Sequence, residues 1–339
     1  MVRSNILNLH PYSSARDEFS GSASVFLDAN ENPFNAPLNR YPDPGQQELK
    51  GRIAELKGVD PAQIFLGNGS DEGIDMLFRV LCEPGVDNVL TVDPSYGMYG
   101  VCAEINGVER RSVLLNRDFS LNAEAVIEAA DERTRLVFLC SPNNPTSNSL
   151  EREAILKIME KLNCLVVVDE AYIEFSHGPG LLSLLSENPK LVILQTLSKA
   201  WGVAGIRLGM LFAHPELIGY LSRVKYPYNI NTLTMEAALK VLESKKRTRA
   251  WVGEIIEERK WMARKLDGLA FVNEVYPSDA NFLLIRVDDP LEVYQFLKKR
   301  SIIIRDRSSV PLCAGCLRIT IGSKEENRAL IAALKTFQS

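Results

Sequence analysis

The chain has 339 residues, enough for about two domains at the usual ~150 residues each. Its 39 Lys and Arg residues are outnumbered by 43 Asp and Glu residues, which gives a formal net charge of −4. Because this balance leaves no basic surplus to neutralise a phosphate backbone, we expect no nucleic-acid partner. The sequence contains no apolar run of the ~20 residues that span a membrane and no recognisable signal peptide. We therefore expect a cytoplasmic protein without membrane contact.

Short apolar runs bounded by turn residues predict buried strands through the middle of the chain. We expect these strands at residues 64–66, 89–92, 136–140, 165–168, 191–194 and 208–213. Apolar residues at helical spacing lie between them, in one helix that ends before residues 83–85 and another that begins near residues 148–151. The repeated order of strand, helix and strand predicts an α/β domain with a mostly parallel sheet covered by helices on both faces. Such sheets bind ligands beyond the carboxyl ends of their strands.

The pattern changes after about residue 245. We expect a long charged helix at 251–266, strands at 281–287, 302–305 and 317–321, a helix at 291–300 and a final helix from about 324. This order predicts a smaller α+β domain. The chain then divides into an N-terminal arm with a short strand that joins the small domain (1–40), a large domain (41–245) and the small domain (246–339).

Most of the six cysteines lie in apolar stretches, as is typical of free buried thiols in a reducing compartment. Cys313 and Cys316 have the spacing of a redox or metal pair, but no second pair follows, and the three histidines are scattered. Since a zinc site needs four ligands, we expect no metal and a structural role for this pair.

The polar residues that follow the predicted strands are of the types that together can bind a single cofactor. Lys199 comes directly after a buried strand, where burial lowers the pKa of an amine, as imine formation requires. Ser198 and Arg207 beside it would clamp an anion. A lysine considered alone is more often a surface residue, but Ser198, Gly202, Gly205 and Arg207 around Lys199 favour a functional role.

Two further segments would hold the ring of that cofactor. Asp169 follows strand 165–168, so its carboxylate should be buried and paired with a cation such as a protonated pyridine nitrogen. Tyr172 would donate to a phenolate oxygen on the ring. The alternative for Asp169 is a helix cap. Asn144, in the proline-containing turn 141–146, presents an amide to the same ring oxygen, or is only part of a turn.

The glycine-rich segment 67–73 lies between a strand and a helix, where backbone N–H groups bind phosphate. Its spacing is G-x-G-x-x-x-G rather than the dinucleotide fingerprint G-x-G-x-x-G, and no acidic residue ends the next strand to hold a ribose. A nicotinamide enzyme is therefore disfavoured. Tyr96 either stacks on the cofactor ring or packs in the core. Together these segments indicate a pyridoxal 5′-phosphate site.

The order of these motifs resembles the fold-type-I pyridoxal-phosphate aminotransferases, and most closely the histidinol-phosphate aminotransferases. The matching segments cover nearly the whole chain, at 10–16, 30–33, 40–43, 70–73, 169–175, 196–200, 304–306 and 316–320. The resemblance implies pyridoxal phosphate as cofactor and a homodimer with shared active sites. It also implies reversible amino transfer between L-histidinol phosphate and 2-oxoglutarate, giving imidazole-acetol phosphate and L-glutamate in histidine biosynthesis.

The resemblance further implies a role for each matching residue. Lys199 would hold the cofactor covalently and then move a proton, and Asp169 would pair with the ring nitrogen. Cofactor contacts are implied for Ser70, Asp71, Tyr96, Asn144, Tyr172, Thr196, Ser198 and Arg207, with Tyr41 reaching the phosphate in the neighbouring subunit. Substrate contacts are implied for Tyr12, Asn281, Arg305 and Arg318.

The chain departs from the family at Ser147, where a glycine is usual. If the backbone there has a positive φ, serine costs about 1 kcal/mol. Alternatives with the same fold are an aromatic aminotransferase and a threonine-phosphate decarboxylase, which also binds a phosphate. A non-enzymatic pyridoxal-phosphate-binding regulator is disfavoured because such proteins carry a basic DNA-binding segment, and we find none in this sequence.

Overall fold

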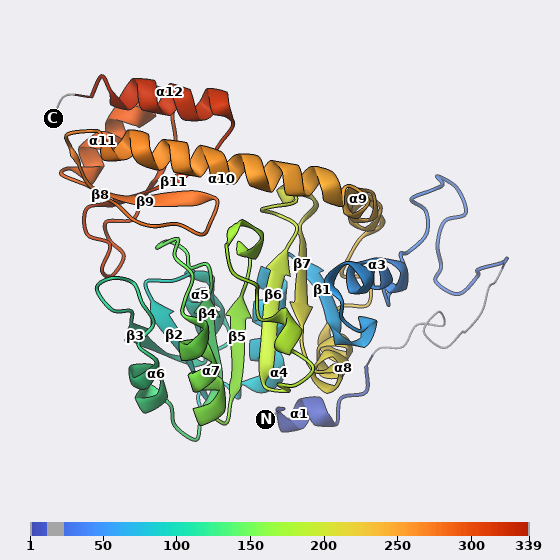
Figure 1. Cartoon of the computed structure of the whole chain (residues 1–339). Helices are drawn as coiled ribbons and strands as arrows, with labels where there is room; N and C mark the ends of the chain where they lie inside the picture. Colours follow the sequence, from blue (N-terminus) through green and yellow to red (C-terminus); the bar gives the residue numbers. More distant parts are fainter. Residues whose placement is uncertain (1, 12–23, 338–339) are drawn as a thin grey trace.

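The computed structural model describes residues 2–11 and 24–337, which form two sheets surrounded by helices (Figure 1). The larger sheet has seven strands in the order β1-β7-β6-β5-β4-β2-β3. Its strands are β1 (Ile64–Asn68), β2 (Asn88–Asp93), β3 (Glu109–Leu114), β4 (Thr134–Cys140), β5 (Leu165–Asp169), β6 (Leu191–Thr196) and β7 (Leu208–Phe212). Only β7 runs antiparallel to its neighbours. The mostly parallel sheet expected from the sequence is therefore confirmed.

Helices cover both faces of this sheet. One face packs against α3 (Gln47–Lys57), α6 (Ala123–Ala129), α7 (Arg152–Lys161) and α9 (Thr232–Leu242). The other packs against α4 (Ser70–Leu81), α5 (Met98–Ile105) and α8 (Pro215–Val224). Adjacent strand residues point to opposite faces, so Phe65 and Leu66 of β1 belong to two separate buried clusters. Short 3₁₀ helices in the described part of the chain are Pro61–Gln63, Ile173–Phe175, Leu182–Leu184 and Ala204–Ile206.

The small domain is built on a four-stranded antiparallel sheet in the order β10-β11-β9-β8. Its elements are α10 (Lys245–Asp267), β8 (Val272–Val275), β9 (Phe282–Val287), α11 (Pro290–Lys298), β10 (Arg305–Asp306), β11 (Cys316–Thr320) and α12 (Lys324–Leu334). All three helices pack on one face. On the other face, Phe282 and Leu284 join the core of the large domain. Figure 1 shows α10 running from the end of α9 across to this sheet.

Two expected strands differ from the structure. The strand predicted at 302–305 is shorter, since only Arg305 and Asp306 pair with β11, and Ile302 N–H donates to Leu297 O at the end of α11. The described residues of the arm, 2–11 and 24–40, contain α1 (Ser4–Leu7) and no strand. Pro33, Pro37 and residues with positive φ interrupt extended pairing there. Within the described residues, no helix has the length and apolarity needed to cross a bilayer.

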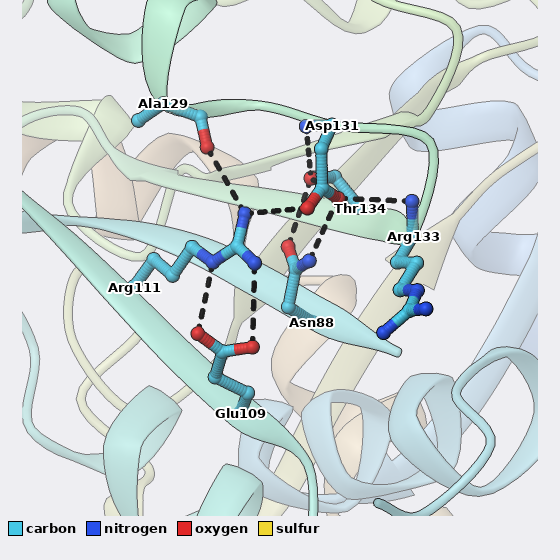
Figure 2. A network of polar contacts seen from close by, with 7 residues as sticks. All are labelled: Asn88, Glu109, Arg111, Ala129, Asp131, Arg133 and Thr134. Carbon is cyan, nitrogen blue, oxygen red and sulfur yellow. Dashed lines mark hydrogen bonds and ion pairs between the residues drawn. The ribbon is translucent and has the colours of Figure 1, made fainter. Parts of the chain in front are cut away.

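A polar network joins the amino ends of β2 and β4 to the turn before β4 (Figure 2). Asn88, which is fully buried, accepts a hydrogen bond from Thr134 Oγ1 at 2.8 Å and donates to Asp131 Oδ1 at 2.8 Å. Arg111 Nη1 lies 2.7 Å from Asp131 Oδ2. Hydrogen bonds from Asn88 and Arg111 hold the pKa of Asp131 well below its usual range. This network lies at the end of the sheet opposite to the polar residues predicted to form the site, so we assign it a structural role.

Candidate active site

One pocket lies at the carboxyl ends of β4, β5 and β6, beside the start of α4. Its lining includes every predicted cofactor residue except Tyr41: Ser70, Asp71, Tyr96, Asn144, Asp169, Tyr172, Thr196, Ser198, Lys199 and Arg207. Segments far apart in the chain meet here because parallel strands end at the same edge of the sheet. The sequence therefore predicted which residues gather around the pocket, while their roles toward a cofactor stay predictions.

The start of α4 forms an anion-binding corner of the pocket. Gly69 precedes the helix with a φ of 77°, and Gly209 of β7 packs directly beneath it. A Cβ on Gly209 would lie 2.1 Å from Ser70 N, so only glycine permits this approach. The free N–H groups of the first turn, the Ser198 hydroxyl and the Arg207 guanidinium all border this corner. They suit the phosphate of the predicted cofactor.

Asp71, in the first turn of α4, connects this corner to the next part of the pocket. Its Oδ1 accepts a hydrogen bond from Tyr96 Oη at 3.0 Å, and its Oδ2 lies 3.8 Å from Arg207 Nη2. Burial and the negative charge of Asp71 raise the pKa of Tyr96 far above its usual range. Tyr96 therefore stays neutral, and the hydrogen bond from its hydroxyl to Asp71 restrains its ring at the pocket wall.

Lys199 follows β6 and lies in the opening of the pocket, with its Nζ 5.7 Å from the centre of the Tyr172 ring. The side chain reaches solvent, yet the surrounding protein removes enough water to lower the pKa of its ammonium. Repulsion from Arg318 adds to this effect. A lowered pKa favours the neutral amine, which is the nucleophilic form.

Asp169, at the end of β5, is only 3% exposed. Its Oδ2 accepts a hydrogen bond from Tyr99 Oη at 2.8 Å, and its Oδ1 accepts one from Ala171 N at 3.1 Å. Burial raises the pKa of Asp169 to about 6. Within the described part of the chain, no basic side chain lies within ion-pair distance of this carboxylate, so a buried acceptor faces the pocket without a cation.

Asn144 connects the pocket to the small domain. Its Oδ1 accepts a hydrogen bond from Arg318 Nη1 of β11. The Arg318 guanidinium also lies over the Phe282 ring, 5.2 Å from its centre, and its Nε is buried without a hydrogen-bond partner in the described residues. Desolvation by burial lowers the pKa of Arg318. A buried cation with an unused donor is suited to bind a carboxylate or a phosphate.

Arg305 and Arg307 form a cationic surface together with Arg318. Arg305 of β10 pairs directly with Arg318 of β11, so the two side chains start from the same face of the sheet. Arg307 follows, and its backbone N–H donates to Cys316 O at 2.9 Å. Burial and repulsion from Arg318 and Arg305 lower the pKa of Arg307, and its Nε has no hydrogen-bond partner among the described residues.

Two other predicted residues, Asn281 and Tyr41, lie outside the lining of the cofactor pocket. Asn281 is next to β9, and its backbone oxygen accepts a hydrogen bond from Ile321 N. Tyr41 is half-exposed and stacks on Tyr228, with ring centres 4.5 Å apart, outside the lining of the main pocket. Tyr12 lies outside the described residues. Within the described residues, the structure of one chain therefore does not place Asn281 or Tyr41 in the lining of the cofactor pocket.

The structure shows the positive φ at Ser147 that the sequence analysis considered. Ser147 has a φ of 69° and is completely buried. Its hydroxyl lies 2.6 Å from Thr146 O and 3.1 Å from Pro277 O, and its own carbonyl accepts from Asp279 N at 2.8 Å. Serine therefore occupies a left-handed position and uses its hydroxyl to contact the small domain.

The cysteine pair lies in the small domain but packs into the same buried cluster as the core of the large domain. Cys313 and Cys316 are both free and fully buried. Within the described residues, no group of three or more His, Cys, Asp or Glu side chains is placed to bind a metal.

Sequence reasoning missed Tyr99 and Arg307. Tyr99 lies in the first turn of α5, three residues after Tyr96, which precedes the helix, and the two rings meet edge-on with centres 5.6 Å apart. Arg307 lies two residues after Arg305, which is the spacing of one strand face. Both signals were visible as spacing, but only the fold shows that Tyr99 contacts Asp169 and that Arg307 lies near Arg318 and Tyr172.

Comparison with known proteins agrees with this geometry. The family model for aminotransferase class I and II matches residues 23–334. The chain belongs to this family. The aminotransferase is also 57% identical, over 100% of its length and 98% of the relative, to the histidinol-phosphate aminotransferase of Parabacteroides distasonis. It is 53% identical to the enzyme of that name from Bacteroides fragilis, with the same coverage.

Solved structures give the same assignment of the fold. The histidinol-phosphate aminotransferase from Clostridium acetobutylicum matches with a TM-score of 0.82 at 25% identity, over 88% of this chain and 90% of that one. The Sinorhizobium meliloti enzyme, solved in complex with pyridoxal-5′-phosphate, matches with a TM-score of 0.79 at 26% identity, over 90% of this chain and 88% of that one. An L-threonine-O-3-phosphate decarboxylase from Porphyromonas gingivalis matches with a TM-score of 0.75 at 25% identity, over 88% of this chain and 91% of that one.

Proposed function

We propose that this aminotransferase uses pyridoxal 5′-phosphate to transfer an amino group between L-histidinol phosphate and 2-oxoglutarate, as a step of histidine biosynthesis. The observation that carries the proposal is a single pocket in which Lys199, Asp169 and the phosphate corner at Ser70 meet the Arg318–Asn144 contact. Identity of 57% to a histidinol-phosphate aminotransferase over the full chain supports the choice of substrate.

Several residues of the chain have separate roles in the proposed reaction. When bound, pyridoxal phosphate supplies an electron sink that stabilises negative charge at the substrate α-carbon. Lys199 would hold the cofactor, and its neutral Nζ would take the proton from the substrate α-carbon. Asp169 would keep a proton on the ring nitrogen, while Tyr172 and Asn144 would bind the phenolic oxygen of the ring.

Two anionic substrates must share one pocket. The donor glutamate carries carboxylates, whereas histidinol phosphate carries a phosphate, and arginine forks bind both. Arg318 is placed beside Asn144 and is suited to the carboxylate. Arg305 and Arg307 extend the cationic surface from the cofactor toward the small sheet, and we assign them to the phosphate. Asn281 and Tyr12 complete the proposed substrate residues.

We further propose that the working unit is a cytoplasmic homodimer in which Tyr41 reaches the cofactor phosphate of the partner subunit. Exposed apolar side chains support this proposal, because they gather in the arm and around α9: Val25 (69% exposed), Leu27 (91%), Phe34 (76%) and Leu233 (60%). Large apolar groups at this density indicate a surface that another chain covers.

The direct test is to mix purified holoenzyme with L-histidinol phosphate and to follow the absorbance of the bound cofactor. We expect loss of the band of the aldehyde form and growth of the band of the amine form. A second assay with 2-oxoglutarate should then yield glutamate. A cofactor that responds to aromatic amino acids and ignores histidinol phosphate would refute the substrate while keeping the aminotransferase.

The threonine-phosphate decarboxylase remains the second candidate, because the Porphyromonas gingivalis structure shares the fold. The two activities differ in product. Release of carbon dioxide from L-threonine O-3-phosphate, without glutamate formation, would favour the decarboxylase.

A further inference from the structure

Tyr99 is held behind the cofactor pocket and directs its hydroxyl at Asp169. Its side chain is 1% exposed, and its Oη lies 2.8 Å from Asp169 Oδ2. The ring stacks on Phe138 with centres 4.8 Å apart and meets Tyr96 edge-on at 5.6 Å. Two aromatic contacts therefore restrain the ring and keep the hydroxyl beside Asp169 Oδ2.

Asp169 receives one fixed donor on each carboxylate oxygen. Tyr99 donates to Oδ2 and the Ala171 backbone donates to Oδ1. Each oxygen can accept about two hydrogen bonds, so acceptor capacity remains on the side that faces the pocket. Asp169 lines the pocket and Tyr99 does not. The Tyr99 hydroxyl can therefore act on a bound cofactor through Asp169, whereas its ring contacts Tyr96 of the pocket lining.

We propose that Tyr99 is a positioning residue whose hydroxyl fixes the Asp169 carboxylate toward the ring nitrogen of the cofactor and keeps that carboxylate ionised. The inference rests on the proposed cofactor and is independent of which amino donor the enzyme uses. An ionised and oriented Asp169 holds the proton on the ring nitrogen, which strengthens the electron sink.

The surroundings of Asp169 explain why such a donor is needed. Burial raises the pKa of Asp169 to about 6, and the hydrogen bond from Tyr99 is the largest effect that opposes this rise. The titratable groups that face Asp169 are Asp71 on α4, Tyr96 before α5, Tyr99 on α5, Cys140 on β4, Tyr172 after β5 and Lys199 after β6. Only Lys199 among them is basic, and its side chain lies at the pocket opening. Without the Tyr99 hydroxyl, the pKa of Asp169 would rise further above its usual value.

The test compares cofactor binding in the Tyr99→Phe variant and the unchanged protein. Phenylalanine keeps the ring and its aromatic contacts and removes only the donor. Since a hydrogen bond to a charged group contributes about 1.5–3 kcal/mol, we expect pyridoxal phosphate to bind about 10- to 100-fold more weakly. We also expect the pH-dependent change in the absorbance of the bound cofactor to shift to higher pH. The reason is that an Asp169 with a higher pKa takes the proton from the ring nitrogen more readily.

A matched control is Tyr276→Phe. Tyr276 is also a buried tyrosine, and its hydroxyl accepts hydrogen bonds from Arg286, at 2.7 Å from Nη2. It lies in the small domain, outside the pocket lining. This variant loses a buried tyrosine hydroxyl without touching Asp169, so its cofactor dissociation constant should match that of the unchanged protein.

A double-mutant cycle separates positioning from a general loss of stability. In an Asp169→Ala background, Tyr99→Phe should change the cofactor dissociation constant by less than about twofold, because the acceptor is gone. An equal loss in both backgrounds would overturn the proposal, as would an unchanged dissociation constant and pH profile in the single variant.

Folding of the variants is checked by circular dichroism. If Tyr99→Phe does not fold, incorporation of 3-fluorotyrosine at position 99 provides the test, since it makes the hydroxyl a stronger donor. We then expect tighter cofactor binding, and unchanged binding would contradict the inference. Absence of cofactor binding in the unchanged protein would instead refute the proposed function.

Discussion

Lys199 illustrates how one side chain depends on its surroundings. It follows a buried strand, and the pocket lowers the pKa of its amine through desolvation and through repulsion from Arg318. In the proposed function, a shorter side chain at this position could neither hold the cofactor nor reach the substrate α-carbon. Its role in chemistry is therefore separable from any role in folding.

We expect Lys199→Ala to lower kcat by about 10²- to 10⁴-fold or more, since the variant lacks the proton-transferring amine. Circular dichroism and the urea midpoint should stay near those of the unchanged protein. Lys161→Ala, which removes an exposed lysine from the end of α7, serves as the control and should keep full activity. Near-normal transamination by Lys199→Ala would contradict the mechanism.

Ser147 combines an unfavourable backbone with a favourable hydroxyl. Its φ of 69° costs about 1 kcal/mol in a non-glycine residue, and its hydrogen bond to a carbonyl recovers about the same amount. We expect Ser147→Gly to be nearly neutral and Ser147→Ala to be about 1 kcal/mol less stable, because alanine keeps the strain and loses the hydroxyl. Urea unfolding measures both free energies. An alanine variant as stable as the glycine variant would show that the hydroxyl contributes nothing.

Polar contacts at the amino ends of β2 and β4 hold these two elements in register. Asn88 is the buried member of the network in Figure 2, and it joins Thr134 to Asp131. Alanine at position 88 removes the acceptor of the buried Thr134 hydroxyl and one of the donors to Asp131, which is exposed. We expect Asn88→Ala to lower the free energy of unfolding by about 1–3 kcal/mol.

Arg133 offers the control for this prediction. Only its backbone N–H contacts Asp131, and its side chain makes no drawn contact (Figure 2). Chemical denaturation of Arg133→Ala should give a value within about 0.5 kcal/mol of the unchanged protein. Equal effects of the two substitutions would mean that the network is not structural.

The pair formed by β10 and β11 presents Arg305, Arg307 and Arg318 from one small piece of sheet. Loss of one charge-assisted hydrogen bond to a phosphate costs about 1.5–3 kcal/mol. We expect Arg307→Gln to raise KM for histidinol phosphate about 10- to 100-fold, with a much smaller effect on KM for glutamate.

Arg300→Gln is the matched control for Arg307, because Arg300 is exposed and packs over Phe296 on the outer side of the small domain. Steady-state kinetics with each substrate in turn separates the two constants. An equal rise of both KM values would assign Arg307 to the shared carboxylate site.

At the scale of the whole molecule, the proposed dimer can be tested by combining two variant chains. Tyr41 stacks on Tyr228 away from the pocket of its own chain. If it completes the pocket of a partner, then Lys199→Ala and Tyr41→Ala chains should each be impaired alone. Mixed after unfolding and refolding together, they should regain activity, because one site of each mixed dimer is intact.

Sedimentation of the mixture checks its assembly. Mixed chains that form dimers without regaining activity would place Tyr41 in the site of its own chain.

The sequence predicted most of this architecture because its strong signals are local. Buried strands such as β5 are continuous apolar runs, and Lys199, Asp169 and Asn144 follow strands whose ends must meet. Strand β3 was missed because Glu109 to Ser112 are polar, as suits an edge strand. The antiparallel direction of β7 and the aim of Tyr99 at Asp169 depend on contacts between distant segments, which no local pattern encodes.

Helix α10 is a single uninterrupted element of 23 residues, about 35 Å long at 1.5 Å per residue. It begins beside α9 of the large domain and ends at the small sheet (Figure 1). It therefore acts as a lever arm, and a rotation of about 5° at its first turn displaces its far end by about 3 Å. That distance is the length of one hydrogen bond. Contacts between the domains, such as that of Arg318 with Asn144, are consequently sensitive to angles too small to alter either core.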